Sequence, residues 1–114
     1  MNHANVSPII RDCISACTAC HEVCVETVDH CLRKGGTHAE PHHIRLLLDC
    51  AEICQACANF MLRGSDLHTG VCAVCAEVCQ RCAEDCGRMS DDEEMRSCAE
   101  KCRECAQSCM SMTR

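Results

Sequence analysis

Cysteines recur at steps of three and four residues through most of this chain. In the stretch CISACTACHEVC, from Cys13 to Cys24, the successive gaps are four, three and four. Side chains at this spacing lie on one face of an α-helix, which completes a turn in about 3.6 residues. Three later segments repeat the pattern, and no segment shows the period-two alternation typical of a half-buried strand. The sequence therefore predicts an all-α fold.

Capping residues and glycines divide the chain into four predicted helices. Ser7 followed by Pro8 is typical of a helix start, and Gly35 of a helix end. Ser90 and Glu93 have the spacing of a capping box, which predicts that the last helix opens there. The predicted helices cover about 8–34, 41–63, 66–86 and 91–111.

The polar side chains indicate which face of each helix points inward. In the second predicted helix, Arg45, Asp49 and Glu52 lie about half a turn away from the cysteines, so the thiols should face the core. Short connections make consecutive helices antiparallel neighbours. We expect one domain over residues 1–114, an antiparallel up-down-up-down four-helix bundle with a Cys-lined core.

Composition and charge exclude several classes of function. The net charge is −6, with no basic cluster to neutralise phosphates, so nucleic acid is not an expected partner. No apolar run approaches the roughly 18 residues that span a bilayer, and the start, MNHANVSPIIRDC, lacks the basic and apolar regions of a signal peptide. We expect a cytoplasmic protein without a membrane partner. No catalytic constellation is present, so an enzyme is not expected.

Metal ligation is the predicted use of the 17 cysteines. Disulfides are rare in a reducing compartment, and an odd number of cysteines cannot pair completely within one chain. Cu(I) is soft, accepts two or three thiolates, and replaces the charge of a displaced proton, so several Cu(I) ions per chain are expected. The predicted ligands are Cys13, Cys17, Cys20, Cys24, Cys31, Cys50, Cys54, Cys57, Cys72, Cys75, Cys79, Cys82, Cys86, Cys98, Cys102, Cys105 and Cys109.

Two other uses of these thiols remain open from the residues alone. Four helices together could supply the tetrahedral ligands of Zn(II), and an iron–sulfur cluster could lie between the helices. The thiols could also act as a redox buffer or sensor by forming disulfides between facing helices. The metal-to-protein ratio and the oxidation state of the isolated protein distinguish these alternatives.

The inward cysteine lines on four predicted helices, the lack of a signal peptide and the connection HAEPHH resemble the cytosolic four-helix-bundle copper storage proteins of bacteria. This resemblance covers the whole chain. It implies a homotetramer that stores and detoxifies copper. We expect a copper chaperone or a small thiol to exchange copper with the protein. Leu46, Ile53 and Phe60, at steps of seven, are expected to contribute to an oligomer face.

Histidines and methionines continue the cysteine lines towards the helix ends. One end of the bundle should gather Met61, His68 and Met112 beside Cys13, and we interpret it as a metal entrance with weaker soft donors. The opposite end, around Cys31, is the alternative entrance. The further auxiliary ligands expected there are His43 and Met95.

Overall fold

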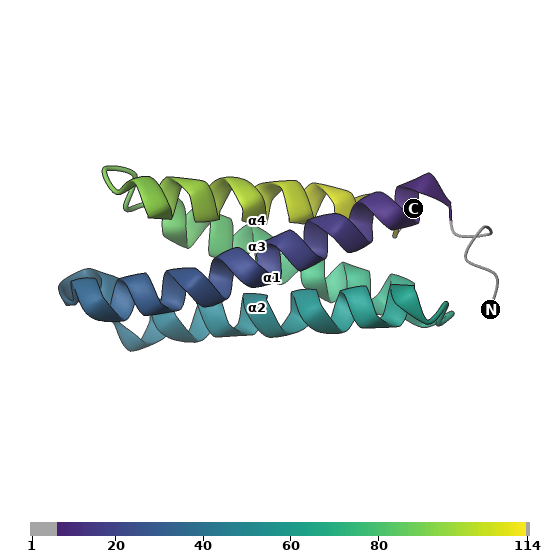
Figure 1. The fold of residues 1–114 in the computed structure, drawn as a ribbon, viewed down its shortest axis with the longest axis horizontal. Helices are drawn as coiled ribbons and strands as arrows, with labels where there is room; N and C mark the ends of the chain where they lie inside the picture. The colour runs from purple at the N-terminus through teal and green to yellow at the C-terminus, as the bar shows by residue number, and fades with distance from the viewer. Residues whose placement is uncertain (1–6, 114) are drawn as a thin grey trace.

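The computed structural model describes residues 7–113, which form four α-helices joined by short connections (Figure 1). No strand occurs among these residues, and the predicted all-α class is confirmed. A short 3-10 helix, η2, connects the first two α-helices. The elements are α1 (Pro8–Lys34), η2 (Gly36–Ala39), α2 (Pro41–Leu62), α3 (His68–Gly87) and α4 (Glu93–Ser111).

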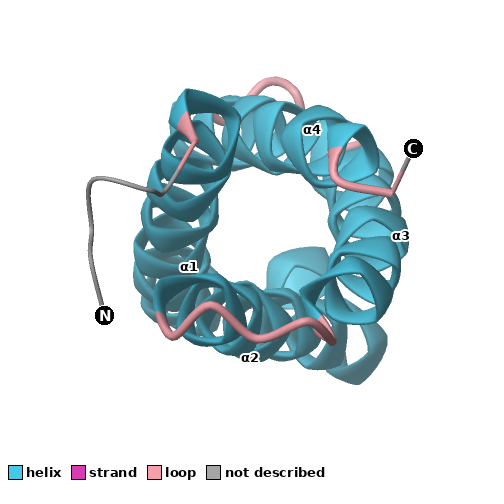
Figure 2. Ribbon diagram, turned by 90° about the vertical axis from the view of Figure 1, so that its right-hand side faces the viewer, coloured by secondary structure: helices cyan, strands magenta, loops and turns pink. Residues whose placement is uncertain are grey.

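The four α-helices run alternately up and down and enclose one core. α1 packs against α2 and α4, and α3 packs against the same two helices. Viewed along the bundle, the helices surround a central space, which the inward side chains fill (Figure 2). The predicted up-down-up-down four-helix bundle is therefore confirmed. Within residues 7–113, no helix is both long and apolar enough to cross a membrane.

The ends of α1 follow from residues visible in the sequence. The Ser7 hydroxyl accepts a hydrogen bond from the Ile10 N–H at 3.2 Å, which satisfies one of the free donors of the first turn. At the other end, Gly35 takes a φ of 73° and donates its N–H to the Cys31 carbonyl at 3.0 Å. A side chain would be strained at that φ, so glycine ends the helix there.

The starts of α3 and α4 differ from the predicted ones. α3 begins at His68, because Ser65 lies in a turn whose carbonyl accepts the His68 N–H. The predicted capping box at Ser90 is wrong. Asp92 is the N-cap instead, and its carboxylate accepts the Met95 N–H at 3.2 Å. After α3 the chain continues in hydrogen-bonded turns as far as Asp92. Asp92 takes the extended conformation of an N-cap, and α4 begins after it.

Cysteine dominates the core. All 17 cysteines lie within the described residues, each is a free thiol, and none is more than 1% exposed. Alanines such as Ala58 and Ala83 flank the thiols and are also buried, which lets the helices approach closely. Among the described residues, the larger apolar side chains of the core are Leu47, Met61 and Met95.

Candidate metal centre

The thiols from all four helices touch one another along the bundle. We call every cysteine except Cys31 a member of the thiol column. The side chains of α1, α2, α3 and α4 meet because each helix presents its cysteines on its inward face. The series of Sγ–Sγ contacts, each between 3.5 and 4.0 Å, links Cys13, Cys109, Cys17, Cys105, Cys54, Cys79, Cys50, Cys20 and Cys24 in that order.

Several overlapping sets of sulfurs within the column are close enough to share an ion. In each set, all ligand atoms lie within 4.8 Å of one another. Cys54, for example, belongs to two such sets. The sets include Cys17–Cys75–Cys105–Cys109, Cys20–Cys50–Cys54–Cys79, Cys20–Cys24–Cys50–Cys102, Cys54–Cys75–Cys79–Cys105 and Cys13–Cys72–Cys109. Because the sets share members, an ion bound in one set can share a thiolate with an ion bound in the neighbouring set.

Contacts between thiols and burial together set the ionisation of the column. S–H···S contacts, first with Cys105, and then burial raise the pKa of Cys54. A contact with the same Cys105 lowers the pKa of Cys75, whereas burial opposes that change. A thiolate formed at one position must share a dry core with its neighbours, so few of these thiols can ionise at once. The metal-free column therefore consists mainly of neutral thiols that pack as small apolar groups.

Cys31 has different neighbours from the column. Its Sγ lies 3.3 Å from His43 Nε2, 3.5 Å from Met95 Sδ and 3.9 Å from His38 Nδ1. We call these four residues the Cys31 group. Burial, followed by electrostatic interactions with Cys98 and with the carboxylates of Asp92, Glu94 and Asp85, raises the pKa of the Cys31 thiol to about 11. The group thus joins α1, η2, α2 and α4 at one end of the bundle.

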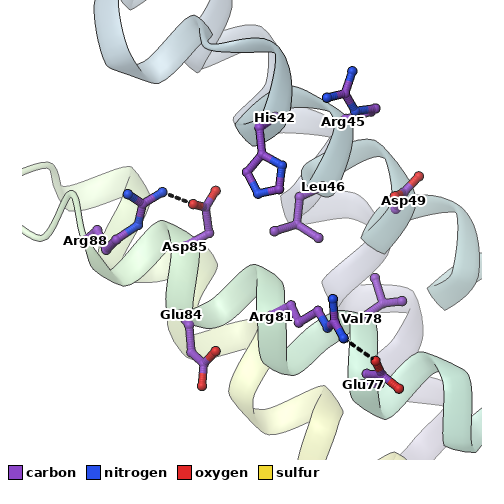
Figure 3. Close-up of a pocket in the computed structure, with 10 residues that line it drawn as sticks. All are labelled: His42, Arg45, Leu46, Asp49, Glu77, Val78, Arg81, Glu84, Asp85 and Arg88. Atoms are coloured by element: carbon purple, nitrogen blue, oxygen red, sulfur yellow. Dashed lines mark hydrogen bonds and ion pairs between the residues drawn. The ribbon is translucent and has the colours of Figure 1, made fainter.

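Asp85 connects His43 to the protein surface. The His43 Nδ1–H donates to the Asp85 carboxylate at 2.5 Å, and Arg88 pairs with the other carboxylate oxygen. Burial raises the pKa of Asp85, but the hydrogen bonds from His43 and Arg88 outweigh it and leave that pKa below its usual value. Asp85 and Arg88 also line a polar surface pocket between α2 and α3 (Figure 3). There, Arg81 pairs with Glu77 at 2.7 Å.

The opposite end holds the other predicted auxiliary ligands. The end of α2, the starts of α1 and α3 and the end of α4 lie at this end of the bundle (Figure 1). Met61 is buried in the core, Met112 is half-buried against it, and His68 donates its Nδ1–H to the Ser65 carbonyl at 2.8 Å. The role of this end as a metal entrance stays a prediction.

Sequence reasoning missed several residues of the core and the Cys31 group. Thr27 is buried where the cysteine line of α1 is interrupted, and Leu47 is buried one turn before the cysteine line of α2 begins. Thr27 follows Cys24 by three residues and Leu47 precedes Cys50 by three, so helical spacing was a usable signal for both. Asp85 gave no such signal, because its partner is 42 positions away in the chain.

The sequence matches the family model of the Csp copper storage proteins over residues 7–114. Among curated proteins, the cysteine-rich protein YhjQ of Bacillus subtilis, described as uncharacterized, is 35% identical over 66 residues. That match covers 58% of this chain and 61% of the length of the relative.

Solved structures with the same fold cover nearly the whole chain. A crystal structure of a Nitrosospira multiformis protein is 43% identical, with a TM-score of 0.86, over 92% of this chain and 94% of that one. The Cu(I)-bound copper storage protein BsCsp3 is 33% identical, with a TM-score of 0.87, over 93% and 99%. A cytosolic copper storage protein from Streptomyces lividans, solved with five coppers, is 32% identical, with a TM-score of 0.81, over 92% of each chain.

The family match extends over all four helices, and the relatives with known structures share their arrangement. The chain therefore belongs to the Csp family of copper storage proteins.

Proposed function

We propose that this protein stores Cu(I), binding several ions per chain through the thiolates of its core. The observation that carries this proposal is the thiol column, in which buried sulfurs from four helices lie 3.3–4.0 Å apart. Its role is storage and buffering of copper, with detoxification as the consequence, rather than catalysis. All 17 cysteines are the proposed ligands, and Met61, His68, Met112, His43 and Met95 are auxiliary ligands.

Cu(I) suits the column because of its softness, its low coordination number and its charge. It binds two or three thiolates without requiring a tetrahedral cage, so ions can occupy neighbouring positions and share sulfurs. Each ion takes over the positive charge of a displaced proton, so the core stays close to neutral at one Cu(I) per thiolate. A divalent ion held by four thiolates would leave two uncompensated negative charges in the core.

The relatives support this choice of metal. BsCsp3 has been solved with bound Cu(I), and the Streptomyces lividans protein with five coppers and after loading with 10 copper equivalents. These proteins share the fold of this chain at TM-scores of 0.81 to 0.87. We infer the same cargo for this chain.

Cellular location and assembly follow as proposals from the same comparisons. The Streptomyces lividans relative is described as cytosolic, and we place this chain in the cytoplasm as well. We propose a homotetramer, in which apolar residues of α2 that remain about half exposed, such as Leu48 and Leu62, become covered. A copper chaperone or a small thiol would exchange copper with the bundle.

An anaerobic Cu(I) titration against a competing chelator tests the proposal. The reduced protein should take up many more than two tightly bound ions per chain, with thiolate-to-copper bands that grow in the ultraviolet until saturation. The substitution Cys54→Ser, in the middle of the column, should reduce the uptake, whereas Ser97→Ala on the exposed face of α4 should not. Saturation at one or two ions would contradict copper storage.

The sets of four thiols support zinc binding as a second candidate. Four sulfurs around Zn(II), with Zn–S bonds of about 2.3 Å, lie about 3.8 Å apart. Cys54 lies 3.5 Å from Cys79, and Cys20 lies 3.8 Å from Cys50, within one such set. A zinc protein would saturate at a few Zn(II) ions per chain and would bind no larger number of Cu(I) ions. Uptake of many more Cu(I) ions than Zn(II) ions would reject this candidate.

A further inference from the structure

The Cys31 group brings together donor types that the thiol column lacks. It has one thiol, one thioether and two imidazoles, contributed by α1, α4, α2 and η2. Cys31, His43 and Met95 are at most 2% exposed, and His38 is half-buried. The Cys31 sulfur is central, because each of the other three donor atoms lies within 3.9 Å of it.

These distances fit one metal ion. With bonds of about 2.0 Å to nitrogen and about 2.3 Å to sulfur, a thiolate and an imidazole on one ion are separated by about 3.5–3.7 Å, and two sulfurs by about 3.8 Å. The observed separations from Cys31 Sγ are 3.3 Å to His43, 3.9 Å to His38 and 3.5 Å to Met95. Each of the three separations is within a few tenths of an ångström of the value expected for a pair of ligands on one ion.

The hydrogen bond from His43 to Asp85 prepares the imidazole as a ligand. In the neutral imidazole that donates from Nδ1 to the carboxylate at 2.5 Å, Nε2 carries the lone pair, and this atom faces Cys31. Carboxylate partners of this kind fix the tautomer and orientation of metal-binding histidines. Arg88 holds the carboxylate in turn, so a chain of contacts from the surface positions His43.

Thr27 lies between Cys24 and Cys31 on α1, and Leu47 lies between His43 and Cys50 on α2. Both side chains are buried, at 2% and 0% exposure, and on their own helices they fall between the column and the Cys31 group. Thr27 turns its hydroxyl to the Val23 carbonyl at 2.7 Å and so presents no free donor to the core. An ion at Cys31 therefore has an environment different from that of an ion between thiolates.

The charges at this end favour a bound cation. The carboxylates of Asp85, Asp92 and Glu94 create a negative potential at Cys31. The same potential attracts a positive ion, whose charge replaces the proton that leaves. Lys34 partly offsets it through its ion pair with Asp92 at 2.8 Å, and His30 hydrogen-bonds the same carboxylate at 2.9 Å.

We propose that Cys31, His43, His38 and Met95 form a mononuclear copper site that holds copper as either Cu(I) or Cu(II), in contrast to the thiol column. One thiolate, two imidazoles and a thioether are the ligand set of blue-copper electron-transfer sites, and imidazole suits Cu(II) better than a core of thiolates does. This proposal rests on the copper binding proposed above and adds a redox function at one end of the store.

The reaction at this site is a single electron transfer. On binding, the Cys31 thiol loses its proton to water and forms the thiolate ligand. Bound Cu(I) then gives one electron to an outer-sphere one-electron oxidant, such as ferricyanide, which becomes ferrocyanide while the copper becomes Cu(II). No bond within the protein is made or broken, and ascorbate reverses the step.

The experiment begins with protein saturated with Cu(I) under anaerobic conditions, so that the thiolates of the column are bound to copper. One equivalent of ferricyanide per chain is then added. We expect one Cu(II) per chain, with an intense thiolate-to-Cu(II) band in the visible and an electron paramagnetic resonance signal of small parallel hyperfine splitting. Both signals should disappear in Cys31→Ser and in His43→Gln, with helical circular dichroism confirming that each variant is folded.

Cys86→Ser is the matched control. Cys86 is a buried thiol near the end of α3, 3.9 Å from Cys98 in the column, and its loss should leave the Cu(II) signals intact. Two results would overturn the redox site while leaving copper storage intact. One is normal Cu(I) uptake followed by only the signal of aqueous Cu(II), and the other is equal loss of the Cu(II) signals in the Cys86 and Cys31 variants. Failure to take up Cu(I) at all would instead reject the storage proposal.

Discussion

Loading the thiol column with Cu(I) should release close to one proton per copper, because the thiols of the metal-free column are largely neutral. Cys54 and Cys105 have their sulfurs 3.7 Å apart. Two thiolates at that distance would repel each other by about 4.5 kcal/mol at an effective dielectric constant of about 20. This energy lowers the population of the doubly ionised pair by more than about a thousandfold. Since each sulfur of the column has sulfur neighbours, few thiols can be ionised before metal arrives.

The ratio of protons to metal depends on the cargo. A column that fills with Cu(I) at one ion per thiolate keeps its charge by releasing one proton for each ion. A Zn(II) ion bound by four thiolates, such as those of Cys20, Cys50, Cys54 and Cys79, would release up to four. The ratio therefore identifies both the protonation state of the column and the way in which it binds metal.

Proton release can be measured in weakly buffered, oxygen-free solution with a pH indicator. Cu(I) is added as its acetonitrile complex, and the base needed to restore the starting pH gives the number of protons. Zn(II) added to the same preparation serves as the comparison. A value below about half a proton per Cu(I) would show that many thiols were ionised in advance, and it would refute the electrostatic argument for a neutral column.

Three further predictions concern single side chains. Cys54→Val should change the free energy of unfolding of the metal-free protein by less than about 1.5 kcal/mol, because a similar apolar volume is kept, while copper capacity falls; urea unfolding and titration measure the two effects. The raised pKa of Cys31 means that the folded state keeps a proton that the unfolded state loses above pH 9.0, so stability should fall by up to about 2.7 kcal/mol as the pH rises towards 11. Urea unfolding over that range should show a smaller decline for Cys31→Ser, and equal declines would contradict the assignment. Asp92→Ala removes the N-cap of α4 and the partner of Lys34, which should cost about 1–2 kcal/mol in urea unfolding at neutral pH, whereas an unchanged midpoint would show that neither interaction stabilises the fold.

The phase of the cysteines allowed most of the fold to be predicted. In the stretch from Cys13 to Cys24, steps of three and four specify both the helix and its inward face. Side chains at these steps point to the same side only when the backbone is helical. Ser7 and Gly35 act locally, through their own backbone geometry, and their roles could be read directly. Asp92 was missed as a cap because the turns after α3 decide which residue becomes extended.

The Cys31 group shows where reasoning from sequence stopped. The helical spacing placed Cys31, His43 and Met95 at one end of the bundle, but it could not indicate which atoms would touch. The contact of Asp85 with His43 depends on the packing of α3 against α2, and the approach of His38 depends on the turn of η2. Neither contact is marked by a periodic pattern in the sequence.

The sulfur contacts between helices have a mechanical consequence for the filled protein. Cys54 of α2 touches Cys79 of α3 and Cys105 of α4, and Cys20 of α1 touches Cys50 of α2, so metal bound between these sulfurs links all four helices. Such a bundle can separate only after metal–sulfur bonds break in many places. Copper must therefore leave by ligand exchange while the bundle stays closed, one ion at a time, and the store gains resistance to heat and proteases in proportion to its filling.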